Sequence, residues 1–363
     1  MTFTAQHIGV EATRFVRERR GIGRYVHNIL RSIPRHRADV RFTMFVARAA
    51  DEVAVRARLD RIDRTLSPRT AVVPVGELPS SDADVIWYPW NWLHPRTHTA
   101  AMVVSILDVA PMLQLDNRWW KVIKRARFRR RFATSLRDAD LVLTISQFSA
   151  SELVKHLHAD RSRIRVTLLA ADDMARAVSD HSAALERLTI TGPFFITVGA
   201  HDDRKNLPTL YRAMELLHAS GDRVPLVQCG PHPATGAPSF VHYAGYVDDT
   251  ELATMYKRST ALVFPSRYEG FGLPVLEAMA AGGRVICADA SSLPEVAGSA
   301  GLMFPWDDAH ALALHMRTLL HDESLRARLT RDGLQQAQRF TWSATARQTL
   351  EVFDEAIALR RQR

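Results

Sequence analysis

Two glutamates, Glu269 and Glu277, stand eight residues apart on either side of a glycine-rich turn. A carboxylate accepts two hydrogen bonds and so suits a pair of neighbouring hydroxyl groups. We expect a helix to begin at Pro274 and to end at Gly282–Gly283, which places Glu269 on the loop before it and Glu277 in its first turn. The free N–H groups around 271–275 then form an anion site at a helix N-terminus. Either glutamate alone would suit an ordinary helix-surface role, but the complete segment predicts a ligand with a phosphate flanked by hydroxyl groups, the shape of a nucleotide sugar.

Strand-like and helix-like segments alternate along the chain. Most of the apolar runs are continuous rather than alternating, as expected for parallel strands that are covered on both faces. The strand candidates are Val40–Val46, Val85–Tyr88, Met102–Leu107, Leu141–Ile145, Ile164–Leu169, Phe194–Val198, Pro225–Cys229, Val241–Tyr243, Ala261–Phe264 and Val285–Cys287. The helix candidates include Gly23–Ile33, Trp119–Leu136, Ser149–Leu157, Leu207–His218, Leu276–Ala281 and Trp342–Arg363.

This alternation predicts an α/β fold with right-handed crossovers. The polar stretch 170–193 separates five strand candidates from five others. We therefore expect two doubly wound, Rossmann-like domains, at 1–175 and 176–341, and a C-terminal helix, 342–363, that packs back toward the N-terminal domain. Ligands bind at the carboxyl ends of the strands in such folds, so we expect the site in a cleft between the two sheets.

Composition places the chain among ordinary globular proteins. It has 363 residues, of which 47% are hydrophobic and 24% charged, which excludes a disordered or fibrous chain. The two cysteines, Cys229 and Cys287, sit singly in apolar segments, and we interpret them as reduced core residues of a cytosolic protein. We find neither a secretory signal nor an apolar run long enough to span a membrane.

Positive charge is concentrated in the N-terminal half. Residues 1–175 carry 29 basic and 18 acidic side chains, a net charge of +11, whereas residues 176–363 carry 19 and 21, a net charge of −2. The segment 118–131 combines eight basic residues with tryptophan and phenylalanine, and 14–24 adds five arginines. Such a mixture suits an anionic membrane surface, the alternative being a solvated face whose aromatic residues pack on the core. No recognition motif for nucleic acid accompanies the charge.

The segment that contains Glu269 and Glu277 resembles the E-x7-E segment of retaining glycosyltransferases of family 4, which have the two-domain GT-B fold. Further resemblances follow in the family's order over nearly the whole chain. They are Gly21-Ile22-Gly23-Arg24-Tyr25, Ser105-Ile106-Leu107-Asp108-Val109-Ala110-Pro111, Thr144-Ile145-Ser146-Gln147-Phe148-Ser149, Val198-Gly199 with Arg204-Lys205-Asn206, and Gly245-Tyr246-Val247.

The resemblance implies roles for individual residues. Arg204 and Lys205 would neutralise the donor diphosphate, and we favour this role over a solvated pair because positive charge at a helix start opposes the helix dipole. Glu277 would hold the ribose hydroxyls and Glu269 the transferred sugar. The implied donor-binding set is Gly199, Arg204, Lys205, Tyr246, Glu269, Gly270, Phe271, Gly272, Leu273 and Glu277; the implied acceptor or phosphate loop is Gly21, Gly23 and Arg24; and the implied catalytic set is Glu269, Arg204, Lys205 and Asp108.

The chain departs from the family in one place, because Leu107 stands where a histidine commonly precedes the aspartate. This puts the donor preference in doubt. Asp108 remains, either as a contact to the acceptor or sugar or as a turn residue. The resemblance implies no metal ion and no cofactor besides the nucleotide sugar.

Taken together, these features predict a retaining hexosyltransferase of bacterial polysaccharide synthesis, including lipopolysaccharide. It would transfer a hexose, mannose from GDP-mannose as the first expectation, to a glycan acceptor that is lipid-linked. The protein would be cytoplasmic and peripheral on the inner face of the cytoplasmic membrane. The alternatives are a GT-B sugar-nucleotide epimerase and an inactive glycosyltransferase-like binding protein. A dinucleotide dehydrogenase is disfavoured because no third glycine follows Gly21 and Gly23.

Overall fold

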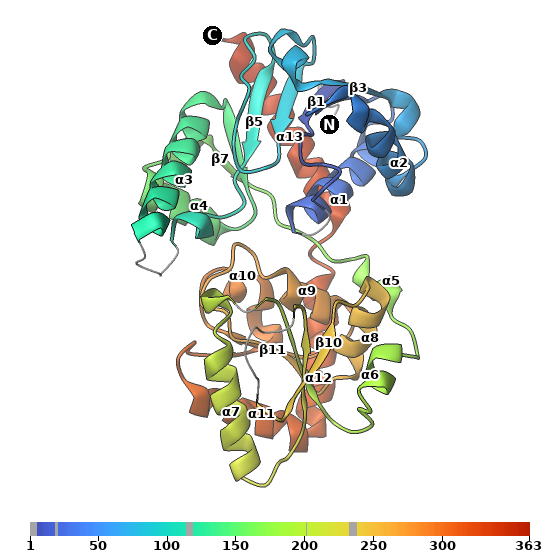
Figure 1. The fold of residues 1–363 in the computed structure, drawn as a ribbon, viewed down its shortest axis with the longest axis vertical. Coiled ribbons are helices and arrows are strands. Elements are labelled where there is room, and N and C mark those ends of the chain that lie inside the picture. The colour runs from blue at the N-terminus through green and yellow to red at the C-terminus, as the bar shows by residue number, and fades with distance from the viewer. Residues whose placement is uncertain (1–5, 19–20, 114–118, 201, 232–237) are drawn as a thin grey trace. The chain divides into compact units, whose positions relative to one another are not determined.

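The chain folds into two compact units, which are drawn in the computed structural model of Figure 1. The structure describes residues 6–18, 21–113, 119–200, 202–231 and 238–363, with the backbone alone at 119–122. Unit 1 comprises Met1–Leu169 together with Trp342–Arg363, and unit 2 comprises Ala170–Thr341. The division falls at Leu169, a few residues before the one that the sequence indicated.

Unit 1 contains a parallel sheet of seven described strands in the order β3-β2-β1-β4-β5-β6-β7. The strand order reverses between β1 and β4, where Val10 pairs with Met44 of β2 on one side and with Trp87 of β4 on the other. The strands are β1 (His7–Glu11), β2 (Arg41–Val46), β3 (Thr70–Pro74), β4 (Val85–Tyr88), β5 (Ala101–Ser105), β6 (Leu141–Thr144) and β7 (Ile164–Val166). The helices are α1 (Ile22–His36), α2 (Glu52–Ile62), α3 (Trp119–Asp138), α4 (Gln147–Leu157) and α13 (Trp342–Arg361), with 3-10 turns η1 (Ala49–Asp51), η2 (Ser67–Arg69), η3 (Val75–Ser80), η4 (Ala110–Met112) and η5 (Arg161–Arg163).

Unit 2 contains a second parallel sheet, of six described strands in the order β10-β9-β8-β11-β12-β13, which reverses between β8 and β11. Its strands are β8 (Phe195–Val198), β9 (Leu226–Cys229), β10 (Val241–Gly245), β11 (Ala261–Phe264), β12 (Val285–Ala288) and β13 (Leu302–Phe304). Its helices are α5 (Met174–Ala177), α6 (Ala183–Arg187), α7 (Leu207–Ala219), α8 (Asp249–Arg258), α9 (Leu273–Ala280), α10 (Leu293–Ala297), α11 (Ala309–His321) and α12 (Glu323–Ala337), with 3-10 turns η6 (Asp203–Lys205) and η7 (Gly298–Ala300).

The ten strands predicted from apolar runs are all present, and three further strands, β1, β3 and β13, were not predicted as strands. β3 and β13 are the edge strands of their sheets and are half-exposed along most of their length. Their apolar runs, Ala71–Val73 and Leu302–Phe304, are only three residues long and were not among the predicted strands. β1 is buried, but Gly9 and the terminal Glu11 interrupt its apolar pattern.

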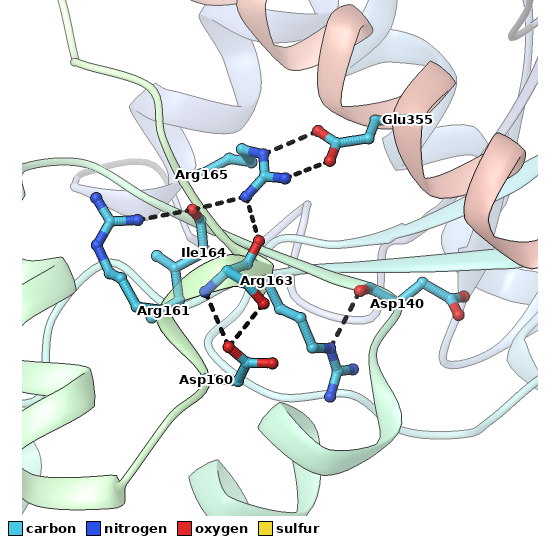
Figure 2. A network of polar contacts seen from close by, with 8 residues as sticks. Asp140, Asp160, Arg161, Arg163, Ile164, Arg165 and Glu355 are labelled. Atoms are coloured by element: carbon cyan, nitrogen blue, oxygen red, sulfur yellow. Dashed lines mark hydrogen bonds and ion pairs between the residues drawn. The ribbon is translucent and has the colours of Figure 1, made fainter.

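The C-terminal helix α13 belongs to unit 1, where it packs against α1 and β5. Figure 2 shows how Arg165 of β7 reaches Glu355 of α13, with Nε donating to the carboxylate at 2.8 Å. The Thr345 hydroxyl donates to the Leu168 carbonyl at 2.7 Å, and the buried carboxylate of Asp140 accepts from Arg363 at 3.0 Å. These contacts hold the last helix on the domain in which the chain begins.

The two cysteines are buried, and burial raises the pKa of both thiols to about 12. They are therefore core residues, as predicted. Within the described ranges, no helix is both long enough and apolar enough to cross a membrane.

Candidate functional site

The clearest candidate site of unit 2 lies where its strand order reverses. β8 and β11 are neighbours in the sheet, so the loops that follow them leave the same edge side by side. This is the position at which open α/β sheets bind ligands. Lys205 follows β8 and Glu269 follows β11, 64 residues later, and Lys205 Nζ donates to Glu269 Oε1 at 2.7 Å. The fold thus brings together two residues that the resemblance had assigned separately to phosphate and sugar.

The ion pair is largely shielded from solvent. The side chains of Lys205 and Glu269 are 17% and 15% exposed. The Lys205 ammonium lies 4.6 Å from the centre of the Phe264 ring, and a small pocket beside it is lined by Gly199 and Ser266. Such shielding strengthens the attraction of the ammonium for an anion.

Gly199 makes room for Lys205. Its φ of +139° is a backbone conformation that favours glycine, and a Cβ at this position would lie 3.0 Å from Lys205 Cε. The resemblance placed Gly199 at the donor phosphate. The structure adds that the absence of its side chain lets the Lys205 stem pass.

Arg204 is held by the neighbouring Asp202. Its Nη2 donates to Asp202 Oδ2 at 3.0 Å, while Asp202 Oδ1 accepts the Arg204 backbone N–H at 2.9 Å. Burial raises the pKa of Asp202. The hydrogen bonds from Arg204 and its charge lower that pKa, and together they outweigh the effect of burial, so the pKa lies below its usual value. Asp202 therefore stays ionised and keeps the guanidinium in place.

The backbone of Glu269 is clamped on both sides. Its N–H donates to Ser291 Oγ at 3.0 Å, and its carbonyl accepts from Ser292 Oγ at 2.9 Å. The Arg267 N–H donates to the carbonyl of Arg204 at 2.8 Å, which links the loops after β11 and β8. The serines come from the loop after β12, the next strand of the sheet.

Asn206 joins the same two loops through its side chain. It is buried, and its Nδ2 donates to the Pro265 carbonyl at 3.2 Å and to the Trp306 carbonyl at 2.6 Å. Its Oδ1 accepts from Arg267 Nη2 at 2.9 Å. The sequence analysis assigned no role to Asn206, Ser291 or Ser292. An asparagine directly after two cations and a serine pair after a strand were the only signals available.

The helix after the glycine-rich turn begins one residue earlier than expected. α9 starts at Leu273, so Pro274 is its second residue and Glu277 lies in its second turn, not its first. Gly272, at φ +99°, is the N-cap and has no side chain with which to cap the helix, and Pro274 has no N–H. The amino end of α9 therefore keeps its affinity for an anion.

The other residues of the predicted donor set differ in exposure. Glu277 is only 5% exposed, and its Oε2 accepts from the Tyr256 hydroxyl at 3.4 Å. The side chain of Phe271 is buried against Phe340, so only its backbone is available to a ligand. Tyr246 follows β10 and is 64% exposed. Gly270 and Gly272 are buried, whereas Leu273 is half-buried.

In unit 1, the glycine loop stands between β1 and α1. Gly21 is the N-cap of α1 at φ +51°, with open space where a Cβ would be. A Cβ on Gly23 would lie 2.0 Å from the Glu18 carbonyl oxygen, so this glycine accommodates the protein's own backbone. Arg24, in the first turn of α1, is half-buried. Asp108 Oδ1 accepts the Ala110 N–H at 2.9 Å, so one oxygen of this carboxylate stabilises a turn.

Comparison with known proteins shows what part of the chain is similar to. Residues 186–336 match the family described as glycosyl transferases group 1. O-antigen chain mannosyltransferase B from Escherichia coli is 34% identical over 234 residues, which are 60% of this chain and 61% of that protein. The chain thus spans less than two thirds of this relative's length.

Solved structures resemble both units. Sucrose-phosphate synthase from Thermosynechococcus elongatus has a TM-score of 0.75 at 18% identity, covering 97% of this chain and 99% of that one. HepE from Anabaena, solved in complex with UDP and glucose, has a TM-score of 0.69 at 15% identity, covering 96% of this chain and 99% of that one. The chain therefore consists of two Rossmann-like units with the GT-B fold, and its residues 186–336 match the group 1 glycosyltransferase family.

Proposed function

We propose that the protein is a retaining hexosyltransferase that moves mannose from GDP-mannose to a glycan in bacterial polysaccharide synthesis. The observation that carries this proposal is the shielded pair of Lys205 and Glu269 at the point where the unit 2 sheet reverses, beside the uncapped start of α9. The E. coli relative, named as an O-antigen mannosyltransferase, supports both the sugar and the pathway. Its name also favours transfer over epimerisation or binding alone.

In this proposal, cationic groups bind the diphosphate of the donor. Lys205 and Arg204 contact the phosphate oxygens, and the amino end of α9 adds the partial positive charge of a helix start. Glu269, held by its backbone, accepts hydrogen bonds from hydroxyl groups of the hexose. Glu277 holds the ribose hydroxyls once the Tyr256 hydroxyl turns away from it.

The chemical step follows from where negative charge develops. The bond between the anomeric carbon and the diphosphate oxygen breaks, and a bond from that carbon to the acceptor hydroxyl forms on the same face of the sugar. The proton of the acceptor passes to an oxygen of the leaving diphosphate. Lys205 and Arg204 stabilise the negative charge that accumulates on this leaving group, and we propose that they do so without a metal ion.

We also propose that the acceptor is lipid-linked and that α3 rests on an anionic membrane surface at the inner face of the cytoplasmic membrane. Phe132 is buried while most of the basic residues are exposed and Arg125 is half-buried, so the described part of α3 turns most of its charge outward. Arg118 lies outside the described residues, as do the side chains of Trp119 and Trp120. The exposed residues include Ile123, Lys124, Arg127, Arg129, Arg130 and Arg131. Cations beside an exposed isoleucine suit lipid headgroups.

The test is calorimetric titration of the purified protein with GDP, UDP, dTDP and ADP, with and without magnesium, followed by transfer assays with the corresponding sugars. The proposal expects GDP to bind most tightly and Lys205→Met to weaken that binding about 10-fold or more. Lys155→Met is the matched control, since Lys155 pairs with Glu152 at 3.9 Å but is 71% exposed. Failure of all four nucleotides to bind would contradict the proposal, and selective binding of UDP or dTDP would reassign the donor.

A further inference from the structure

A buried glutamate ends the central strand of unit 1. Glu11 is the last residue of β1, next to β4, where the strand order of this sheet reverses. Its side chain is 1% exposed. Oε1 accepts the N–H of Thr13 at 3.0 Å, but no described residue makes a hydrogen bond with Oε2. One oxygen of this carboxyl group is thus satisfied by the protein and the other is not.

The surroundings of Glu11 combine aromatic and cationic groups. The indole N–H of Trp90 donates to the Glu11 carbonyl at 2.7 Å, which fixes the loop after β4 against the end of β1. The Arg14 guanidinium lies 3.9 Å from the centre of the Trp92 ring, and its charge also acts on the Glu11 carboxyl. Arg131 of α3 lies 5.0 Å from the same ring. Trp92 therefore fixes the position of the Arg14 guanidinium through cation–π contact.

This arrangement is poor for stability. A buried carboxyl oxygen without a hydrogen bond loses its hydration and receives nothing in exchange. Burial raises the pKa of Glu11, and the Thr13 hydrogen bonds and the Arg14 charge oppose that rise. A neutral side chain of the same shape would satisfy the Thr13 N–H at a lower cost. Groups that cost stability in this way are concentrated at ligand sites.

We propose that Glu11 binds a hydroxyl group of the acceptor sugar through Oε2, and that Arg14, positioned by Trp92, donates to a neighbouring oxygen of the same sugar. Because Glu11 is buried, a sugar reaches Oε2 only if the residues that cover it move. This inference rests on the proposed function, because it takes the acceptor to be a sugar. It differs from the glycine loop of Gly21 and Gly23 in assigning acceptor recognition to a carboxylate on the strand itself.

The test uses Glu11→Gln in the full-length chain. The Thr13 N–H requires an acceptor, so the glutamine oxygen takes the place of Oε1 and the NH2 group, which only donates, takes the place of Oε2. Glu152→Gln is the control, because Glu152 is also a buried glutamate of unit 1 but pairs with Lys155 and His156. The readouts are mannotriose affinity by NMR titration without donor, GDP affinity by calorimetry, and Tm.

We expect Glu11→Gln to weaken mannotriose binding about 10-fold or more, to leave GDP binding unchanged, and to leave Tm equal or higher. Arg14→Ala, which changes a side chain nearer the surface, is expected to weaken mannotriose binding as well. Equal mannotriose affinity in wild type and Glu11→Gln would overturn the inference, as would no mannotriose binding by the wild type. A fall in Tm accompanied by loss of both ligands would show a structural role and overturn it too. Failure of the donor proposal would appear separately, as an absence of nucleotide binding.

Discussion

Replacing Lys205 by methionine removes the ammonium group that faces Glu269 Oε1 at 2.7 Å while keeping a stem of similar length over Phe264 and beside Gly199. Breaking a buried ion pair by removing one partner costs about 3–5 kcal/mol, because the remaining charge stays buried and unpaired. The side chains of Lys205 and Glu269 are 17% and 15% exposed, so water partly solvates Glu269. We therefore expect a loss of about 2–3 kcal/mol in the free energy of unfolding of unit 2. For a domain of this size, this corresponds to a fall of roughly 4–12 °C in Tm.

The double variant Lys205→Met/Glu269→Gln separates charge from packing. It leaves no unpaired charge, so its unfolding free energy should return to within about 1 kcal/mol of the wild type, while GDP binding stays weak. Urea denaturation and scanning calorimetry measure the first effect, and titration with GDP measures the second. Lys155→Met removes an exposed lysine, and His156 remains beside Glu152, so this variant should cost less than about 1 kcal/mol. If the double variant is as unstable as Lys205→Met, the cost does not arise from an unpaired charge and the reasoning is wrong.

Three further predictions concern the same site and the basic helix. Gly199→Ala places a Cβ at φ +139° and 3.0 Å from Lys205 Cε, so it should cost about 1–3 kcal/mol of stability and weaken GDP binding, and unchanged GDP affinity would refute the steric argument. The pKa of Asp202 is lower in the folded protein than its usual 3.8, so the stability it contributes is present above that value and is lost as the pH falls below it. Urea titrations between pH 6 and pH 3 should therefore show a smaller fall in unfolding free energy for Asp202→Asn than for the wild type. An equal fall in both proteins would show that the contact between Asp202 and Arg204 does not contribute to it. Replacing four arginines of α3 by glutamine should reduce sedimentation with anionic vesicles at low salt; the four are Arg127, Arg129, Arg130 and Arg131. Replacing exposed arginines of α12 is the control and should have no such effect. Equal sedimentation of the α3 variant and the wild type would indicate that this face of α3 is only solvated.

Several features of the fold could be predicted from local sequence. Parallel strands that are covered on both faces must be apolar throughout, so runs such as Val85–Tyr88 and Ala261–Phe264 marked strands with the bounds that the structure has. The half-exposed edge strands β3 and β13 contain only three consecutive apolar residues each and were missed. The start of α9 was also misplaced by a residue, because both Leu273 and Pro274 suit the first turn of a helix.

The sequence by itself determined the α/β class, the glycine-rich turn between Glu269 and Glu277 and the residues to inspect, because these depend on residue types and short spacings. Only the tertiary structure decided which of these residues meet. Lys205 contacts Glu269 because β8 and β11 are neighbours in the sheet, and no local pattern specifies the pairing of strands so far apart in the chain. Burial is decided in the same way. Glu11 is buried, and one of its oxygens has no partner among the described residues. Its five-residue strand contains no sign of this, because burial depends on segments that lie far away in the chain.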